Sequence, residues 1–195
     1  IIEGNPDLLP TNSNELSFWF SQAWPADGFR FSTSFDYTHF YNQTILDQTI
    51  DENSLTYVKP VNYQGGSTFW GNANFSFPII KNKFKGHVGY NHNISNSFSI
   101  VNKVLNETIT KTVRPRLNID FTPHDDFALY LYSSIGRTNT EYNINKSQNQ
   151  IINRKDINLQ CNIGFGKKFF LASSYNHSFF DNETTNISED IPIIN

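Results

Sequence analysis

The stretch GFRFSTSFDYTHFYN, residues 28–42, alternates between aromatic and polar residues along nearly its whole length. Most odd positions carry an aromatic ring, whereas most even positions carry a hydroxyl or a charge. Successive side chains of a β-strand point to opposite faces, so this period of two predicts a strand with one aromatic face and one polar face. The aromatic face would hold Phe29, Phe31, Phe35 and Tyr37, and the polar face Arg30, Ser32, Ser34 and Asp36.

The same alternation returns in three later stretches, residues 69–79, 113–121 and 157–165. No window has apolar residues at the helical spacing over enough length to predict a helix. The sequence therefore predicts an all-β protein, an antiparallel meander of about eight long strands. We expect these strands at residues 14–24, 29–42, 55–80, 84–98, 107–122, 127–136, 151–165 and 169–180.

The connections between these strands are of two kinds. Short polar turns are expected at 25–28, 81–83, 124–126 and 166–168, and a phenylalanine follows each turn at once. Longer links rich in asparagine and serine are expected at 42–56, 92–108, 136–151 and from 181 onward. The sequence thus predicts tight hairpins at one end of the sheet and long loops at the other. The four phenylalanines after the turns are Phe29, Phe84, Phe127 and Phe169.

Composition excludes several classes of protein. Hydrophobic residues make up 37% of the chain, and no apolar run is long enough for a membrane-spanning helix. The net charge of −3 gives no basic footprint for nucleic acid, so we expect no nucleic-acid partner. A single cysteine, Cys161, excludes an internal disulfide framework and a cysteine-based zinc site. The five histidines lack ligand spacing, so neither a metal nor a cofactor is expected.

An aromatic face opposite a polar face fits either a soluble β-sandwich or a transmembrane β-barrel. Long strands, short turns alternating with long links, and aromatics after the turns all favour the barrel. On this interpretation the apolar residues face lipid or form an interfacial girdle, and the charged residues face the lumen. The predicted lipid-facing set is Phe29, Phe31, Phe35, Tyr37, Phe75, Phe77, Phe84, Phe127 and Phe169. The predicted lumen-facing set is Arg30, Asp36, Arg114, Arg116 and Asp120.

The segment GNPDLLPTNSNELSFWF, residues 4–20, resembles the stretch that precedes a barrel strand in TonB-dependent outer-membrane receptors. The remaining aromatic, asparagine-rich hairpins most resemble outer-membrane β-barrel proteins of the Bacteroidetes type. Thr11 departs from the motif, because the family usually has glutamate there. The matching residues, for which we expect a structural role, are Gly4, Asn5, Pro6, Leu8, Pro10, Glu15 and Leu16.

The resemblance implies that residues 1–195 are one partial barrel domain, cut from a longer chain and lacking the plug domain. It implies a place in the outer membrane of a Gram-negative cell and import of a scarce nutrient, such as a metal chelate or glycan. The implied partners are outer-membrane lipid, an unidentified imported ligand, and the TonB complex through the missing plug region. A plugless barrel with a structural or adhesive role is the alternative.

An enzyme is not expected, because the sequence offers no nucleophile with a base at a recognisable spacing. Asp36 and Asp120 could supply a carboxylate pair for acid–base chemistry, but nothing in the sequence brings them together. We therefore predict no catalytic residues.

Overall fold

The computed structural model describes residues 1–165 and 169–194. Strands dominate these residues, and the one helical element in the described ranges is a short 3-10 turn, η1 (Lys146–Gln148). The predicted turn at 166–168 lies outside the described residues. The strands are β1 (Asn12–Trp24), β2 (Phe29–Tyr41), β3 (Gln43–Ile50), β4 (Thr56–Tyr63), β5 (Ser67–Ile80), β6 (Phe84–Val101), β7 (Val104–His124), β8 (Phe127–Tyr142), β9 (Gln150–Phe165), β10 (Phe169–Asn182) and β11 (Ile187–Ile194).

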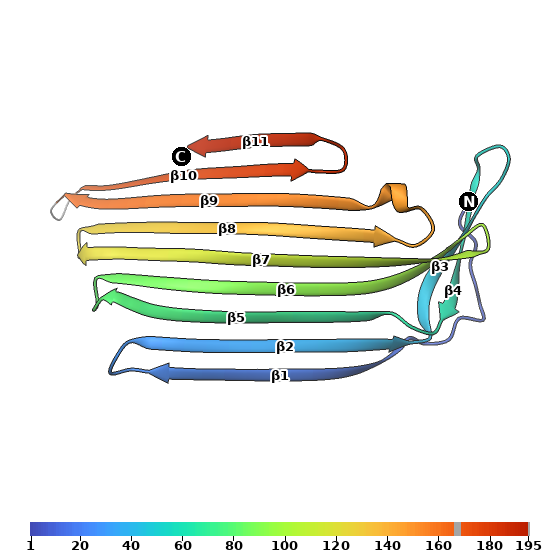
Figure 1. The fold of residues 1–195 in the computed structure, drawn as a ribbon, viewed down its shortest axis with the longest axis horizontal. Coiled ribbons are helices and arrows are strands. Elements are labelled where there is room, and N and C mark those ends of the chain that lie inside the picture. The colour runs from blue at the N-terminus through green and yellow to red at the C-terminus, as the bar shows by residue number, and fades with distance from the viewer. Residues whose placement is uncertain (166–168, 195) are drawn as a thin grey trace.

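All eleven strands belong to one sheet. Nine of them lie side by side in the order β1-β2-β5-β6-β7-β8-β9-β10-β11, and each pair of neighbours is antiparallel. Figure 1 shows this path as a single layer in which β1 and β11 form the two outer edges. The prediction of an all-β, antiparallel fold is confirmed, and the sheet is open: it does not close into a barrel.

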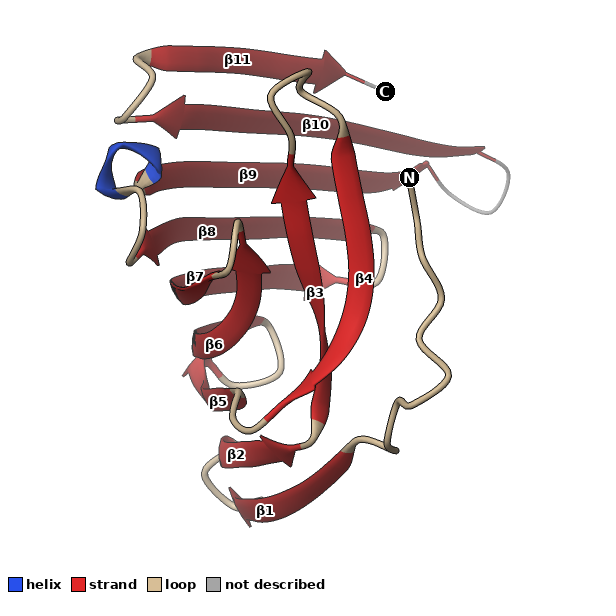
Figure 2. Ribbon diagram, turned by 90° about the vertical axis from the view of Figure 1, so that its right-hand side faces the viewer, coloured by secondary structure: helices blue, strands red, loops and turns tan. Residues whose placement is uncertain are grey.

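The hairpin of β3 and β4 leaves this path. The chain turns out of β2 at Asn42, whose φ of 51° lies in the left-handed region, and β3 then runs beside the tip of β6. There Asp47 and Gln48 pair in parallel with Ile100 and Val101. Figure 2 shows β3 and β4 crossing one end of the curved sheet. The hairpin is therefore an insertion at that end.

The predicted long loops were wrong, and this accounts for the difference between eight strands and eleven. Residues 42–56 contain β3, residues 181–194 contain β11, and the range 55–80 divides into β4 and β5 at Gly65 and Gly66. The other two links are mostly the outer ends of strands, joined by the Asn102–Lys103 turn or by the connection that contains η1. Asparagine has low β propensity, but ladder pairing with long neighbouring strands outweighs it here.

The register divides the sheet into two faces. Residues directly opposite each other on neighbouring strands share a face, and Phe31 lies opposite Phe75, which lies opposite Val88 and then Leu117. We call this side the apolar face and the opposite side the polar face. Every predicted lipid-facing residue falls on the apolar face, and every predicted lumen-facing residue falls on the polar face.

The described residues build no hydrophobic core of the ordinary kind. Ile45, in the β3–β4 hairpin, is the single apolar side chain that they bury, at 4% exposed. Large apolar side chains elsewhere remain open, among them Leu171 at 52%. No helix in residues 1–165 and 169–194 is long and apolar enough to cross a membrane. The ladder of backbone hydrogen bonds, rather than a core, holds this single layer together.

Candidate functional site on the polar face

A continuous row of small and charged side chains crosses the polar face. The register brings together residues from seven neighbouring strands, so that positions far apart in the sequence lie next to each other. Ser32 lies opposite Asn74 at one end of this row, and Asp156 lies opposite Ser178 at the other. The full row, in strand order, is Ser32, Asn74, Gly89, Arg116, Ser134, Asp156 and Ser178.

Asp156 is the centre of the first cluster on this face. Its carboxylate accepts hydrogen bonds from Arg114 Nη2 at 2.8 Å, from Arg154 Nε at 2.9 Å and from Ser178 Oγ at 2.8 Å. Arg114 Nη2 also donates to Ser134 Oγ at 3.0 Å. The Asp156 side chain is only 13% exposed, so its charge depends on these partners. We call these five residues the Asp156 cluster; its groups satisfy one another and stabilise the strands β7 to β10.

Arg116 forms the second feature of the polar face. Its side chain extends from β7 across β6, and Nη2 donates to Asn74 Oδ1 on β5. It passes over Gly89, where a Cβ would come within 2.3 Å of Arg116 Nε. Glycine inside a strand often marks such a close approach. Asn74 in turn donates to Asn72 Oδ1 at 2.9 Å, so Arg116 is held in place by amides from another strand.

Ser76, His87 and Asp120 lie beside Arg116. His87 Nδ1 is 2.8 Å from Ser76 Oγ, and His87 Nε2 is 3.1 Å from Asp120 Oδ2. Hydroxyl, imidazole and carboxylate therefore follow one another as they do in serine hydrolases. However, β5 has strands on both sides, so the backbone N–H groups around Ser76 are committed to the ladder. No backbone oxyanion hole can form there.

A hollow opens between these side chains, which we call the Arg116 hollow. It is polar, and Asn118 contributes a buried Oδ1 that has no hydrogen-bond partner among the described residues. Arg116 and Asp120 bring opposite charges to its wall. Its lining comprises Asn74, Ser76, His87, Val88, Gly89, Arg116, Asn118 and Asp120.

The structure brings together only part of the set predicted for the polar face. Arg114 belongs to the Asp156 cluster, Arg116 and Asp120 line the hollow, and Arg30 lies opposite Ser76. Asp36 lies three strands from Asp120 and eight residues further along the register, about 26 Å in the strand direction. The two carboxylates therefore do not form a pair.

His87, Ser76 and Asp156 were not predicted as site residues from the sequence. The signal was present in the alternation, because His87 has the parity of the polar face whereas His92 has that of the apolar face. The structure confirms this split: His87 contacts Ser76 and Asp120, and His92 packs against an aromatic ring on Phe69. What alternation cannot supply is the register between strands.

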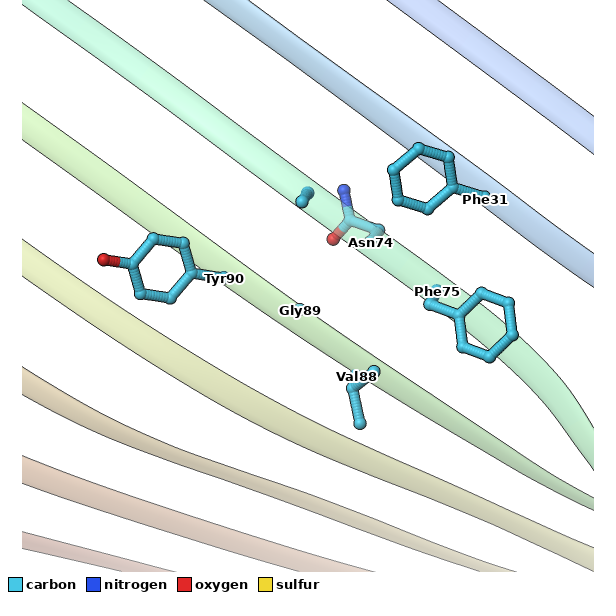
Figure 3. A pocket seen from close by; sticks show the side chains of 7 residues that line it. Phe31, Asn74, Phe75, Val88, Gly89 and Tyr90 are labelled. Atoms are coloured by element: carbon cyan, nitrogen blue, oxygen red, sulfur yellow. The ribbon is translucent and has the colours of Figure 1, made fainter.

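The apolar face carries a ladder of aromatic rings. Phe18 and Phe35 stack with their centroids 5.3 Å apart, and Phe29 and Phe75 stack at 5.8 Å. Figure 3 shows Phe31, Phe75, Val88 and Tyr90 around a shallow hollow between β5 and β6. These rings contact each other across strands, which stabilises the pairing. The girdle residues Phe84, Phe127 and Phe169 share this face.

The segment that carries the family motif lies along β4. Ile2 forms a parallel bridge with Val58, and Asn5 Nδ2 donates to the Pro60 carbonyl at 2.9 Å. Leu8 and Pro10 lie between the turn at Pro6–Asp7 and the start of β1. Within β1, Glu15 has the parity of the polar face and Leu16 that of the apolar face. The remaining motif residues are Gly4, of which a Cβ would touch nothing, and Pro6.

Neither a metal site nor a comparison with known proteins identifies the function of the chain. Within residues 1–165 and 169–194 there is no group of three or more histidine, cysteine or acidic side chains placed to hold a metal ion. No known family model matches the chain, and no curated protein matches it significantly.

Proposed function

We propose that this chain is part of the wall of a transmembrane β-barrel in the outer membrane of a Gram-negative cell. Its apolar face would contact lipid, and its polar face would line a water-filled interior. The observation that carries the proposal is the regular displacement of the four phenylalanines that follow the turns.

These phenylalanines shift by a constant step relative to the hydrogen-bonded rows. One such row passes through Phe31, Val88, Ser133 and His177, all on the apolar face. Measured along each strand from that row, the phenylalanine after the turn lies two residues away on β2, four on β6, six on β8 and eight on β10. These residues are Phe29, Phe84, Phe127 and Phe169.

This step converts into an angle. A shift of one residue per strand is about 3.3 Å along the strand for every ~4.8 Å across the sheet. A line through the four rings is therefore tilted by about 35° from the hydrogen-bonded rows. If the rings lie at one depth, the strands cross that plane with the same tilt, which falls in the range of 35–45° for barrels. Register and aromatic placement thus support a barrel geometry independently of composition.

The distribution of polarity gives a second argument. Phe169 is 72% exposed and Leu171 52%, and no other layer of the described chain covers them. A single sheet with an open apolar face needs an apolar environment on that side. Arg114 and Arg116, which lie in the interior of β7 on the opposite face, would each cost ~2–4 kcal/mol if they pointed into the middle of a bilayer. Lipid against the exposed apolar side chains and water against these two arginines satisfies both groups.

For the whole protein we propose import by a TonB-dependent receptor, because residues 4–20 resemble the motif of that family. The ligand would be a scarce nutrient such as a metal chelate or a glycan. A plugless barrel with a structural or adhesive role is the second candidate. The gene sequence upstream of the codon for Ile1 separates the two: a plug domain there supports import, and its absence contradicts import.

We propose no catalytic role for Ser76, His87 and Asp120. They form the right sequence of hydrogen bonds, but Ser76 lies in the middle of a central strand without backbone oxyanion donors. The intact protein should therefore not hydrolyse p-nitrophenyl esters above the buffer rate. Turnover that disappears in a Ser76→Ala variant would contradict this part of the proposal.

Fractionation tests the membrane assignment. The protein should be recovered with the outer membrane, should stay there through carbonate extraction, and should need detergent for release. Recovery in a soluble fraction without detergent would contradict the barrel and favour a soluble β-sheet protein.

A further inference from the structure

We propose that the Arg116 hollow binds the carboxylate or phosphate group of an anionic solute. The inference deepens the proposed function, on which it rests in one respect: the polar face must be open to water.

The charge of the polar face differs from that of the chain as a whole. The chain carries 15 cationic and 18 acidic residues, a net charge of −3. Four successive polar-face rows run from the Lys85–Asp120 row to the Asn91–Arg114 row, both included. On β2 to β10 these rows hold five cations and two carboxylates. We call these rows the central belt. The cations are Arg30, Lys85, Arg114, Arg116 and Arg154, and the carboxylates are Asp120 and Asp156.

Arg116 is the cation in this belt that is best placed to bind a solute. Arg114 and Arg154 share the Asp156 carboxylate, so each already donates to a carboxylate and their combined charge is partly compensated. Arg116 donates instead to the neutral amide of Asn74, and it makes no ion pair among the described residues. A guanidinium has five N–H donors in a planar fork. Arg116 therefore keeps donors for a planar or tetrahedral oxyanion.

The hollow is built so that Arg116 lies flat and accessible. Position 89 must be glycine for the Arg116 side chain to lie across β6. A Cβ there would come within 2.3 Å of Arg116 Nε and within 3.0 Å of Asn74 Oδ1. Asn118 lies in the same wall, and its Oδ1 has no partner among the described residues. Its Nδ2, the donor of the same amide, also makes no hydrogen bond among the described residues, so it can donate to an oxyanion without breaking an existing bond.

One carboxylate faces the same hollow and must be counted. Asp120 lies on the wall, but its Oδ2 is engaged by His87 Nε2 at 3.1 Å. Lys85 lies directly opposite Asp120, and Arg30 lies opposite Ser76. Neither Lys85 nor Arg30 makes an ion pair among the described residues. Three cations, Arg30, Lys85 and Arg116, therefore surround the hollow against one carboxylate, Asp120.

Isothermal titration calorimetry of the full protein in a neutral detergent tests the proposal. The probes are inorganic phosphate and succinate, with glucose as the uncharged control, at low ionic strength. Phosphate or succinate should bind at least tenfold more tightly than glucose, and added sodium chloride should weaken the binding. Equal or absent binding of all three probes would overturn the inference.

Variants locate the site. Arg116→Gln should lose about tenfold or more in anion affinity, because a charge-assisted hydrogen bond is lost. Arg137→Gln is the matched control: it removes the same charge, but Arg137 lies on the apolar face and pairs with Glu183 at 3.5 Å. Its anion affinity should equal that of the parent. If both variants lose affinity equally, the binding reflects overall charge and the proposal is wrong.

A second variant keeps the test decisive if Arg116→Gln fails to fold. Asn118→Leu leaves the charge unchanged and should still weaken anion binding about threefold, since it removes one neutral donor. Unchanged binding in a folded Asn118→Leu variant, checked by circular dichroism, would exclude the hollow as the site. The outcome is independent of fractionation: a membrane protein without anion binding loses this inference alone, whereas a soluble protein that binds anions loses the barrel alone.

Discussion

Asn62 holds the backbone of Leu9 from both sides: its Oδ1 accepts the Leu9 N–H at 2.7 Å, and its Nδ2 donates to the Leu9 carbonyl at 2.9 Å. The same Nδ2 lies 2.7 Å from the Asn42 carbonyl, where the chain leaves β2. One amide thus joins the motif segment, the end of β2 and β4. The backbone conformation around Leu9 therefore depends on this side chain, whereas Ile1 to Asn5 are held by their own contacts with β4.

Replacing Asn62 by alanine should release the motif segment. Two backbone groups of Leu9 would lose their partner, a loss of about 1–2 kcal/mol of local stability. Hydrogen–deuterium exchange should become roughly tenfold faster at and around Leu9 and stay unchanged in β7 to β9. Asn53→Ala is the control, because Asn53 lies in an exposed turn and its side chain makes no hydrogen bond among the described residues. Equal exchange in the two variants would show that Asn62 does not hold the segment.

Replacing Asp156 by alanine should destabilise the sheet between β7 and β10. The change leaves Arg114 and Arg154 without their acceptor and removes the bond from Ser178. We expect a loss of about 1–3 kcal/mol in the free energy of unfolding, measured by urea denaturation of the protein in lipid vesicles. Asp125→Ala, in the exposed β7–β8 turn, should change it by less than about 0.5 kcal/mol. A stable Asp156→Ala variant would mean that the Asp156 cluster contributes little.

Substitution by arginine at two neighbouring positions of β9 tests which face contacts lipid. Leu159 is on the apolar face and Gln160 is on the polar face. In lipid vesicles Leu159→Arg should cost about 2–4 kcal/mol, because the charge would enter the bilayer. Gln160→Arg should be close to neutral, since its side chain would reach water. Equal unfolding free energies for the two variants would contradict the assignment of lipid to the apolar face.

Gly86 accommodates an aromatic ring. A Cβ there would lie 2.5 Å from Phe77 Cζ, so the ring covers the glycine on the apolar face. Gly86→Ala should force Phe77 aside and cost about 1–3 kcal/mol, measured as a fall in the urea midpoint. Gly4→Ala is the control, because nothing lies within 4 Å of a Cβ at that position. A neutral Gly86→Ala variant would show that Phe77 can move away without loss.

The two faces of the sheet were predictable from the sequence because strand alternation has a period of two. Knowing the parity of Phe31 or Arg116 is enough to place it, and the register agrees for each predicted residue. The helix-free, antiparallel fold follows from the same signal. Hence the chemistry of each face could be read without any knowledge of which strands are neighbours.

The ends of the strands and the assembled site could not be predicted in the same way. In the outer parts of β6 and β7 the residues are mostly polar, so alternation fades and the segment looked like a loop. The β3–β4 hairpin depends on left-handed backbone at Asn42 and on pairing with the tip of β6. The contact of Arg116 with Asn74 requires the register of three strands and the absence of a side chain at Gly89. These features depend on tertiary contacts between distant segments, which the residues of one segment do not reveal.

The most direct test of the account is the depth of the four phenylalanines in a bilayer. Cys161 would be replaced by serine, and a single cysteine placed in turn at Phe29, Phe84, Phe127 and Phe169 would carry a bimane label in protein reconstituted into vesicles. Quenching by lipids brominated at known depths then gives the position of each label. The account predicts that all four lie at one interfacial depth, because the register steps by one residue per strand while the strands tilt by ~35°. Labels at progressively different depths, or labels that brominated lipids fail to quench, would contradict the transmembrane barrel.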